Sequence, residues 1–276
     1  MTIREIEILI EEGNSLKQIA QAYSEIANLK LKRIRGELDR NRIFFKEIAQ
    51  IYGMVKNIAL KRGLAVSKPK KTISLIITSN YRFYGKINSS LIDFFISSTQ
   101  NLKTDRIILG KAAIDYFRAQ KVFQNYTEIM LKDDQPDPWE LMNLVNLIKD
   151  YSQVLVFHPQ FKSFLVQQPQ AADIIAATQN IGEEEGQTIK FIFEPELSKI
   201  LSFFDSQILV LLLEETFLES EVARTASRFI SMDQAETEAN KYIKENEELK
   251  GYVKRNLINN QILESFASLS AVRREM

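Results

Sequence analysis

The sequence predicts a mixed protein of the α+β or α/β class, in which long N- and C-terminal helices pair as an antiparallel coiled coil and flank a central α/β domain. All six prolines lie between Pro69 and Pro195, so both flanks are free of the residue that breaks helices most strongly. Both flanks also carry apolar residues at helical spacing, whereas the middle carries short β-branched runs. These observations predict an N-terminal helix within residues 1–67, a central domain over 68–195, and a C-terminal helix within 196–276 that pairs with the first.

The N-terminal flank carries an apolar stripe whose members fall mostly three or four residues apart, as on one face of a helix. Its members are Ile3, Ile6, Ile10, Leu16, Ile19, Tyr23 and Ile26. The C-terminal flank has a similar stripe, formed by Leu218, Val222, Phe229, Met232, Ala239 and Ile243. There we expect one helix from about residue 206 to about residue 272, interrupted only by Gly251. Each stripe is expected to face a helical partner.

The middle of the chain alternates short apolar runs with helix-like segments. The runs at residues 72–78, 106–109, 153–157 and 188–193 are rich in β-branched residues and predict buried strands. Helices are expected between them at residues 89–100, 111–120 and 139–150. This alternation is typical of a Rossmann-like α/β layer with partly parallel strands.

Composition excludes several classes of function. Lysine plus arginine equals aspartate plus glutamate at 36 each, so no net charge favours a nucleic-acid partner. The absence of cysteine excludes disulfides, thiolate nucleophiles and cysteine-ligated metals, and fits a reducing compartment. The N-terminus does not resemble a signal peptide, and the most apolar run, residues 208–213, is too short to span a bilayer. We therefore expect no direct membrane insertion.

No constellation of residues predicts catalysis, a cofactor site or a metal site. A glycine-rich phosphate loop is absent, so the chain is not expected to hydrolyse ATP alone. The turn at residues 80–88 could hold a ligand, but a structural turn in which Asn88 or Ser89 caps the next helix is the favoured interpretation. His158 is expected to be a packed or surface residue rather than a catalyst. The acidic residues 183–185 are expected to form a solvated loop.

Two basic clusters lie near the ends of the chain. One consists of Lys30, Lys32, Arg33 and Arg35, and the other of Lys250, Lys254, Arg255, Arg273 and Arg274. Each is either a solvated helix face or a surface for an acidic partner.

Residues along the whole chain resemble one known family. At the start, the family pattern is matched by Ile6, Ile10, Ile19, Ala22, Ala27, Lys30 and Leu31, and in the middle by Gly110, Lys111 and Phe117. At the end it is matched by Glu194, Pro195, Leu201, Glu219, Ser220, Arg228, Met232, Asp233, Ala235, Ala239, Ile258 and Glu264. In this pattern the chain resembles the gamma subunit of F-type rotary ATP synthases.

The resemblance implies a non-catalytic rotor in the central stalk. Its helices would turn inside a hexamer of alpha and beta subunits, coupling proton or sodium flow to ATP synthesis or hydrolysis. An epsilon-type subunit and the c-ring of the membrane sector would be the other partners, at the cytoplasmic face of the bacterial plasma membrane. The implied subunit-interface residues are Lys30, Arg33, Arg228, Lys254, Arg255, Ile258 and Glu264. A foot on the membrane ring would consist of Phe191 and Glu194.

The chain also departs from the family pattern. Asn80, Tyr81, Arg82 and Lys86 replace marked positions of a glycine-rich turn, and Ala223, Arg224 and Thr225 replace a Ser-Glu-His run. Two alternatives therefore stay open. One is the rotor of a variant F-type-like ATPase with a different output. The other is a coiled-coil scaffold or adaptor, whose broken heptads would suit any helical partner.

Overall fold

A computed structural model describes residues 1–62, 71–179 and 194–272. They form two compact units, which we describe separately. The helical unit combines residues 1–26 with residues 229–276, and the main unit contains residues 27–228. Two helices, α1 (Ile3–Lys61) and α6 (Leu197–Val272), each contribute to both units. The predicted strand at 188–193 and the predicted loop at 183–185 lie outside the described residues.

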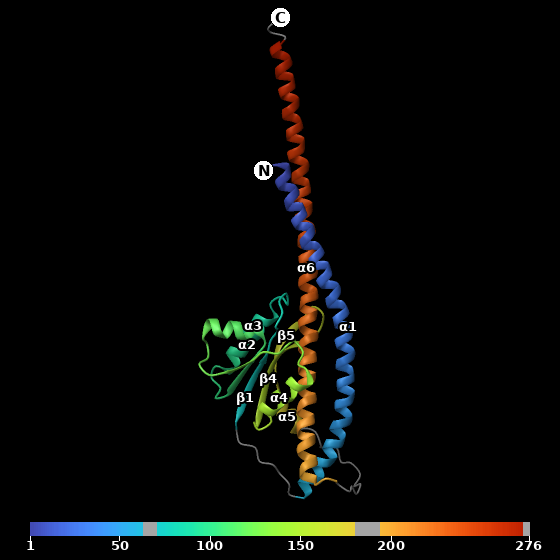
Figure 1. Ribbon diagram of the computed structural model, residues 1–276, viewed down its shortest axis with the longest axis vertical. Coiled ribbons are helices and arrows are strands. Elements are labelled where there is room, and N and C mark those ends of the chain that lie inside the picture. Colours follow the sequence, from blue (N-terminus) through green and yellow to red (C-terminus); the bar gives the residue numbers. More distant parts are fainter. Residues whose placement is uncertain (63–70, 180–193, 273–276) are drawn as a thin grey trace. The chain divides into compact units, whose positions relative to one another are not determined.

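The helical unit is an antiparallel pair formed by α1 and α6 (Figure 1). Glu7 forms an ion pair with Lys250 at 2.9 Å, and the Gln21 amide donates a hydrogen bond of 2.7 Å to Glu236. Buried positions recur every seven residues, at Ile6, Gly13 and Ala20 on α1 and at Met232, Ala239 and Asn246 on α6. This heptad spacing is that of a coiled coil and confirms the predicted pairing.

Two of the buried α1 positions in the contact with α6, which we call the seam, are the small residues Gly13 and Ala20. A Cβ atom on Gly13 would lie 2.8 Å from Cγ1 of Ile243, so only glycine fits at this contact. The predicted stripe is therefore wrong in part, because Leu16, Ile19 and Ile26 are 60%, 53% and 53% exposed. Close approach of two helices selects small side chains at the contact, and the larger apolar residues then lie beside the seam rather than in it.

The main unit contains a five-stranded sheet in the order β3-β2-β1-β4-β5. The strands β1 (Thr72–Ile77), β2 (Asp105–Leu109), β3 (Thr127–Ile129) and β4 (Gln153–Phe161) are parallel, and β5 (Gln167–Asp173) is antiparallel to β4. This confirms the predicted partly parallel α/β layer. Neither β3 nor β5 was predicted, because β3 has only three residues and β5 reads QQPQAAD, without a β-branched residue.

Helices cover both faces of this sheet (Figure 1). On one face, α2 (Ile87–Thr99) and α3 (Lys111–Gln120) pack Phe95 and Phe117 against Phe157. On the other face, α4 (Pro138–Ile148), α5 (Ile174–Gln179) and the first half of α6 pack around Leu75 and Val156. Each fully buried side chain of this size contributes about 1.5–3 kcal/mol. The sheet therefore fixes α6 within the main unit.

The helix boundaries agree with the sequence in most places. The bounds of α3 are those predicted, whereas α6 begins at Leu197, nine residues earlier than expected. Asp137 caps α4 in a capping box with Glu140. The predicted cap of α2 is wrong, because α2 begins at Ile87, ahead of both candidate residues, and no side chain caps it. Among the described residues, no helix has an apolar stretch long enough to cross a membrane.

Candidate functional site

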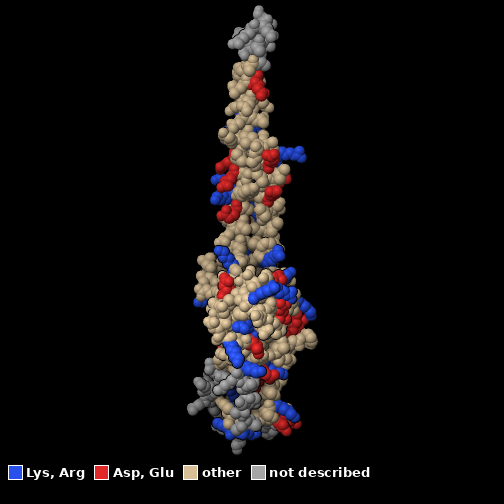
Figure 2. All heavy atoms as spheres, turned by 90° about the vertical axis from the view of Figure 1, so that its left-hand side faces the viewer, with Lys and Arg blue, Asp and Glu red and all other residues tan. Residues whose placement is uncertain are grey.

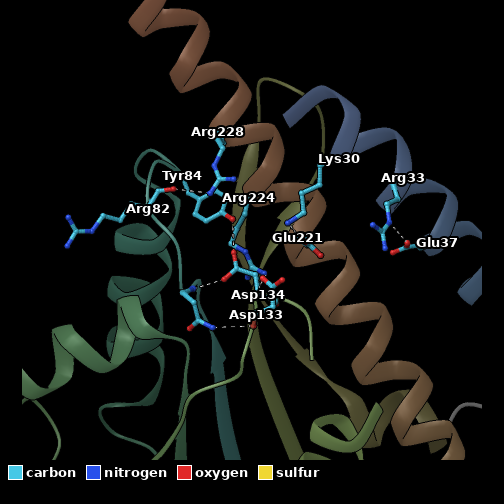
Figure 3. A network of polar contacts seen from close by, with 11 residues as sticks. Lys30, Arg33, Glu37, Arg82, Tyr84, Asp133, Asp134, Glu221, Arg224 and Arg228 are labelled. Carbon is cyan, nitrogen blue, oxygen red and sulfur yellow. Dashed lines mark hydrogen bonds and ion pairs between the residues drawn. The ribbon is translucent and has the colours of Figure 1, made fainter. Parts of the chain in front are cut away.

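A network of charged and polar side chains joins α6 to the α/β layer of the main unit (Figure 3). We call it the polar junction and define it by Lys30, Tyr84, Asp134, Glu221, Arg224 and Arg228. Lys30 comes from α1, and the last three come from α6. Tyr84 lies in the loop after β1, and Asp134 lies in the loop between β3 and α4.

Asp134 is the centre of the junction and is 2% exposed. One carboxylate oxygen accepts a hydrogen bond of 2.6 Å from the main-chain N–H of Asn80. The other accepts a hydrogen bond of 2.6 Å from the hydroxyl of Tyr84. Burial, followed by the negative charge of Asp134, raises the pKa of the Tyr84 hydroxyl, which therefore stays protonated and remains a donor.

Arg224 brings a fully buried positive charge from α6 to this centre. Its Nη2 donates a hydrogen bond of 3.3 Å to the main-chain carbonyl of Asp134. Its Nε and Nη1 have no hydrogen-bond partner within the part of the chain that the structure describes. One turn earlier on α6, Glu221 is ion-paired with Lys30 of α1. Burial raises the pKa of Glu221, and the positive charge of Lys30 opposes that shift.

Arg228 extends the junction by one further turn of α6. Its guanidinium carbon lies 3.9 Å from the centre of the Tyr84 ring, within the range of a cation–π contact. Its Nη2 donates a hydrogen bond of 3.0 Å to the carbonyl of Arg82, and Ser227 donates one of 2.8 Å to the carbonyl of Tyr84. The junction therefore holds two loops of the α/β layer against α6.

The turn at residues 80–88 is part of this arrangement. In doubly wound sheets, ligands bind where such turns follow the carboxyl ends of the strands. Here the Asn80 amide donates a 2.9 Å hydrogen bond to the carbonyl of Leu131, and its oxygen accepts a 3.0 Å bond from the N–H of Lys111. The Asn88 amide donates a 2.7 Å bond to the hydroxyl of Ser79. These side chains are committed to internal contacts, which supports the structural interpretation of the turn.

His158 is a packed core residue. It is 2% exposed, and burial lowers its pKa to about 4, so the imidazole is neutral near neutral pH. In the described parts of the chain, no three histidine or acidic side chains are grouped in a way that could hold a metal ion.

The structure places the predicted interface residues in three settings. Lys30 and Arg228 belong to the polar junction, whereas Arg33 pairs with Glu37 on the same helix at 2.9 Å. The other four, Lys254, Arg255, Ile258 and Glu264, are exposed on α6 in the helical unit. Two residues were predicted to contact the membrane ring. Of these, Glu194 is exposed, and Phe191 lies outside the described residues.

The C-terminal part of α6 exposes an apolar surface. Its large exposed side chains are Tyr252, Leu257, Ile258, Ile262, Leu263 and Phe266. Figure 2 shows few charged side chains on the visible side of this part of α6, below the grey atoms at its end. Exposed apolar surface of this kind on a helix is typical of a segment that binds another protein.

Four members of the junction were not predicted as site residues, namely Tyr84, Asp134, Glu221 and Arg224. Their contacts join segments far apart in sequence, as between Asp134 and Arg224, which are 90 residues apart, or between Lys30 and Glu221. One local signal existed, since Glu221 and Arg224 follow the apolar residues Phe217 and Leu218 at helical spacing on α6. Charges that a helix buries within its apolar face require partners from elsewhere in the fold.

Known proteins match this chain over most of its length. The sequence pattern of the ATP synthase family matches residues 2–272. The ATP synthase gamma chain of Pelotomaculum thermopropionicum is 25% identical over 187 residues, which cover 65% of this chain and 66% of that protein. The gamma chain of Staphylococcus epidermidis is 21% identical over 257 residues, which cover 88% of this chain and 89% of that protein.

Two solved structures are similar to the fold. The rotor of the Euglena gracilis mitochondrial ATP synthase contains a chain with a TM-score of 0.62 and 14% identity, covering 93% of this chain and 99% of that one. The central stalk and c-ring structure of the Tetrahymena thermophila mitochondrial enzyme contains a chain with a TM-score of 0.59 and 18% identity, covering 79% of this chain and 99% of that one.

Proposed function

The chain belongs to the ATP synthase family, as a gamma chain, and we propose that it works as the central rotor that couples ion-driven rotation to ATP synthesis or hydrolysis. The observation that carries this proposal is the antiparallel coiled coil of α1 and α6, formed from both ends of a chain that matches the family over residues 2–272. Gamma chains are the non-catalytic subunits of the complex, and catalysis takes place in the beta subunits. This chain is accordingly not itself an enzyme.

The physical role of such a rotor follows from its asymmetry. One helical shaft inside a ring of three alpha and three beta subunits presents a different surface to each catalytic site. A contact that differs between sites biases each site toward a different nucleotide affinity. Rotation passes these biases around the ring. The exposed residues Lys254, Arg255, Ile258 and Glu264 are the contacts that we propose for the hexamer.

Lys30, Arg33 and Arg228 are proposed as further interface residues. Arg33 is the best placed of the three, since its side chain is 79% exposed beside Glu37. Lys30 and Arg228 make internal contacts in the polar junction, so we propose that they also transmit force from the α/β layer to α6.

The partners on the membrane side of the complex are proposed from the resemblance to the gamma-chain family. Phe191 and Glu194 would contact the c-ring, and an epsilon-type subunit would pack on the α/β domain. We place the complex at the cytoplasmic face of a bacterial plasma membrane, since the gamma chains compared above come from bacteria. The proposed boundaries are a shaft helix over 1–67, an α/β domain over 68–195 and a second shaft helix over 196–276.

Reconstitution tests this function. The alpha and beta subunits from the same genome are purified with and without the chain, and mass and ATPase activity are measured. We expect one copy of the chain per hexamer and faster ATP turnover. A chain that neither binds the hexamer nor changes its turnover contradicts the proposal and favours a coiled-coil scaffold.

A further inference from the structure

A groove of about 560 Å³ lies among three helices of the main unit. Its walls come from α1, from α4 with the turn that precedes it, and from the first half of α6. This volume lies within the range of about 300–1,000 Å³ that is usual for ligand pockets, and it would accommodate a few side chains of a partner. The groove is separate from the polar junction, since none of the junction residues lines it.

The rim of the groove exposes large apolar side chains. Phe44 on α1 and Met142 on α4 line it and are 51% and 43% exposed. Trp139, the single tryptophan of the chain, lies one turn before Met142 on α4 and is 73% exposed. Residues three apart on a helix are neighbours, so Trp139 continues the apolar rim beyond the groove. Tryptophan, methionine and phenylalanine are enriched where proteins bind one another.

Among its mainly apolar lining, the groove also carries the polar side chain of Asn41 and the acidic side chains of Glu37 and Glu214. Asn41 is 8% exposed and lines the groove, and its amide donates a 3.0 Å hydrogen bond to Glu214. The Asn41 oxygen has no hydrogen-bond partner within the described residues. Burial raises the pKa of Glu214, and nearby Glu37 adds to that shift. The amide oxygen of Asn41 and the half-buried carboxylate of Glu214 therefore favour a ligand that brings a hydrogen-bond donor and a positive charge.

We propose that this groove docks a segment of another subunit of the same complex, and that the segment presents one Lys or Arg side chain between apolar side chains. The cation would lie at Glu214 and Asn41, and the apolar neighbours would cover Phe44 and Met142. Arg40 also lines the groove and is exposed, which disfavours a second cation. A partner protein fits better than a small molecule, because the exposed rim at Trp139 extends past the groove itself.

This inference rests on the proposed function, because the partner is a subunit of that complex. The chain has no cysteine, so a single Met142→Cys substitution creates a unique site for labelling. The rate of maleimide labelling is measured on the free chain and on the assembled complex. A benzophenone maleimide at the same position is then photo-cross-linked, and the attached peptide is identified by mass spectrometry.

We expect slower labelling of residue 142 in the complex and a cross-link to one subunit, at a segment with Lys or Arg between apolar residues. Glu214→Gln in the Met142→Cys background should raise the labelling rate in the complex about tenfold, the size expected for losing one hydrogen bond to a charged group. Asp93→Asn is the matched control. It removes one exposed negative charge from α2, on the other face of the sheet, and should leave the rate unchanged.

An assembled complex in which residue 142 is labelled as fast as in the free chain overturns the inference and leaves the proposed function standing. A cross-linked segment without a basic residue, or a Glu214→Gln rate equal to the control, overturns the assignment of a basic segment. Failure of the hexamer to bind the chain overturns the proposed function together with this inference.

Discussion

The buried guanidinium of Arg224 donates a hydrogen bond of 3.3 Å to the main-chain carbonyl of Asp134. A side chain of α6 is thereby bonded to the loop between β3 and α4. Because Arg224 is fully buried, its charge depends on Asp134, Glu221 and the surrounding dipoles for stabilisation. In a rotor, this contact would be one of those that transfer torque between the α/β layer and α6.

Removing Arg224 should therefore destabilise the chain strongly. We expect Arg224→Ala to lower the free energy of unfolding by about 3 kcal/mol, because it removes the buried positive charge beside the buried carboxylates of Asp134 and Glu221. Urea denaturation of the full chain, followed by circular dichroism, measures the change. Arg118→Ala is the matched control, since Arg118 pairs with Glu128 at an exposed site where solvent screens the charges, and this substitution should change stability much less than Arg224→Ala. Equal effects of the two substitutions would contradict a structural role for Arg224.

Tyr84 and Asp134 should be energetically coupled through their 2.6 Å hydrogen bond. Tyr84→Phe is expected to cost about 1–2 kcal/mol, because it leaves one buried oxygen of Asp134 without this donor. In the Asp134→Asn background the same substitution should cost less. A double-mutant cycle measured by urea denaturation should give a coupling energy of about 1 kcal/mol or more. Additive effects would show that the two side chains act independently.

The helical unit should be sensitive to side-chain size at Gly13. Gly251→Ala should stabilise the chain by about 0.5–1 kcal/mol through helix propensity, because nothing lies within 4 Å of the added Cβ. Gly13→Leu should instead destabilise it by about 1–3 kcal/mol, because the new side chain overlaps Ile243 and Tyr242. Thermal unfolding of both variants distinguishes them. A stabilising Gly13→Leu would contradict the close packing of this seam.

Stability should also depend on pH through His158. Folding lowers the pKa of this residue from its ordinary value of 6.5 to about 4. Its contribution is therefore fully present above pH 6.5 and is lost as the pH falls through about 4, with a total of roughly 3 kcal/mol. At pH 5 about 2 kcal/mol of it should be lost. His158 is the only histidine, so its NMR signal reports the pKa directly in the full chain. A signal that titrates near pH 6.5 would contradict burial of the neutral imidazole.

Sequence patterns were sufficient to place the helices and strands that are marked by one clear local signal. The bounds of α3 were predicted correctly, and β1 and β2 were placed to within one residue at each end, because helical spacing and β-branched runs mark these elements. The strand β5 lacks such a signal. It is an edge strand held by its antiparallel ladder with β4, and that ladder brings Pro169 opposite Pro159. Tertiary pairing therefore outweighs local propensity in β5.

The seam between α1 and α6 and the polar junction were predicted less well from the sequence. The apolar pattern predicted that Leu16 and Ile19 face α6, whereas Gly13 and Ala20 occupy the close contact between the two helices. The family resemblance identified Lys30 and Arg228 but not Asp134, which lies in a loop between two secondary-structure elements. A loop carboxylate has no periodicity, and only the folded structure shows that a buried arginine contacts it.

Direct observation of rotation tests the central claim most directly. A single cysteine replaces Lys103, an exposed residue of the α/β layer, in the otherwise cysteine-free chain, and a bead is attached to it in the complex with immobilised alpha and beta subunits. We predict that the bead turns persistently in one direction while ATP is hydrolysed, and stops when ATP is removed. A bead that shows only random motion while the hexamer hydrolyses ATP would contradict the assignment of this chain as the rotor.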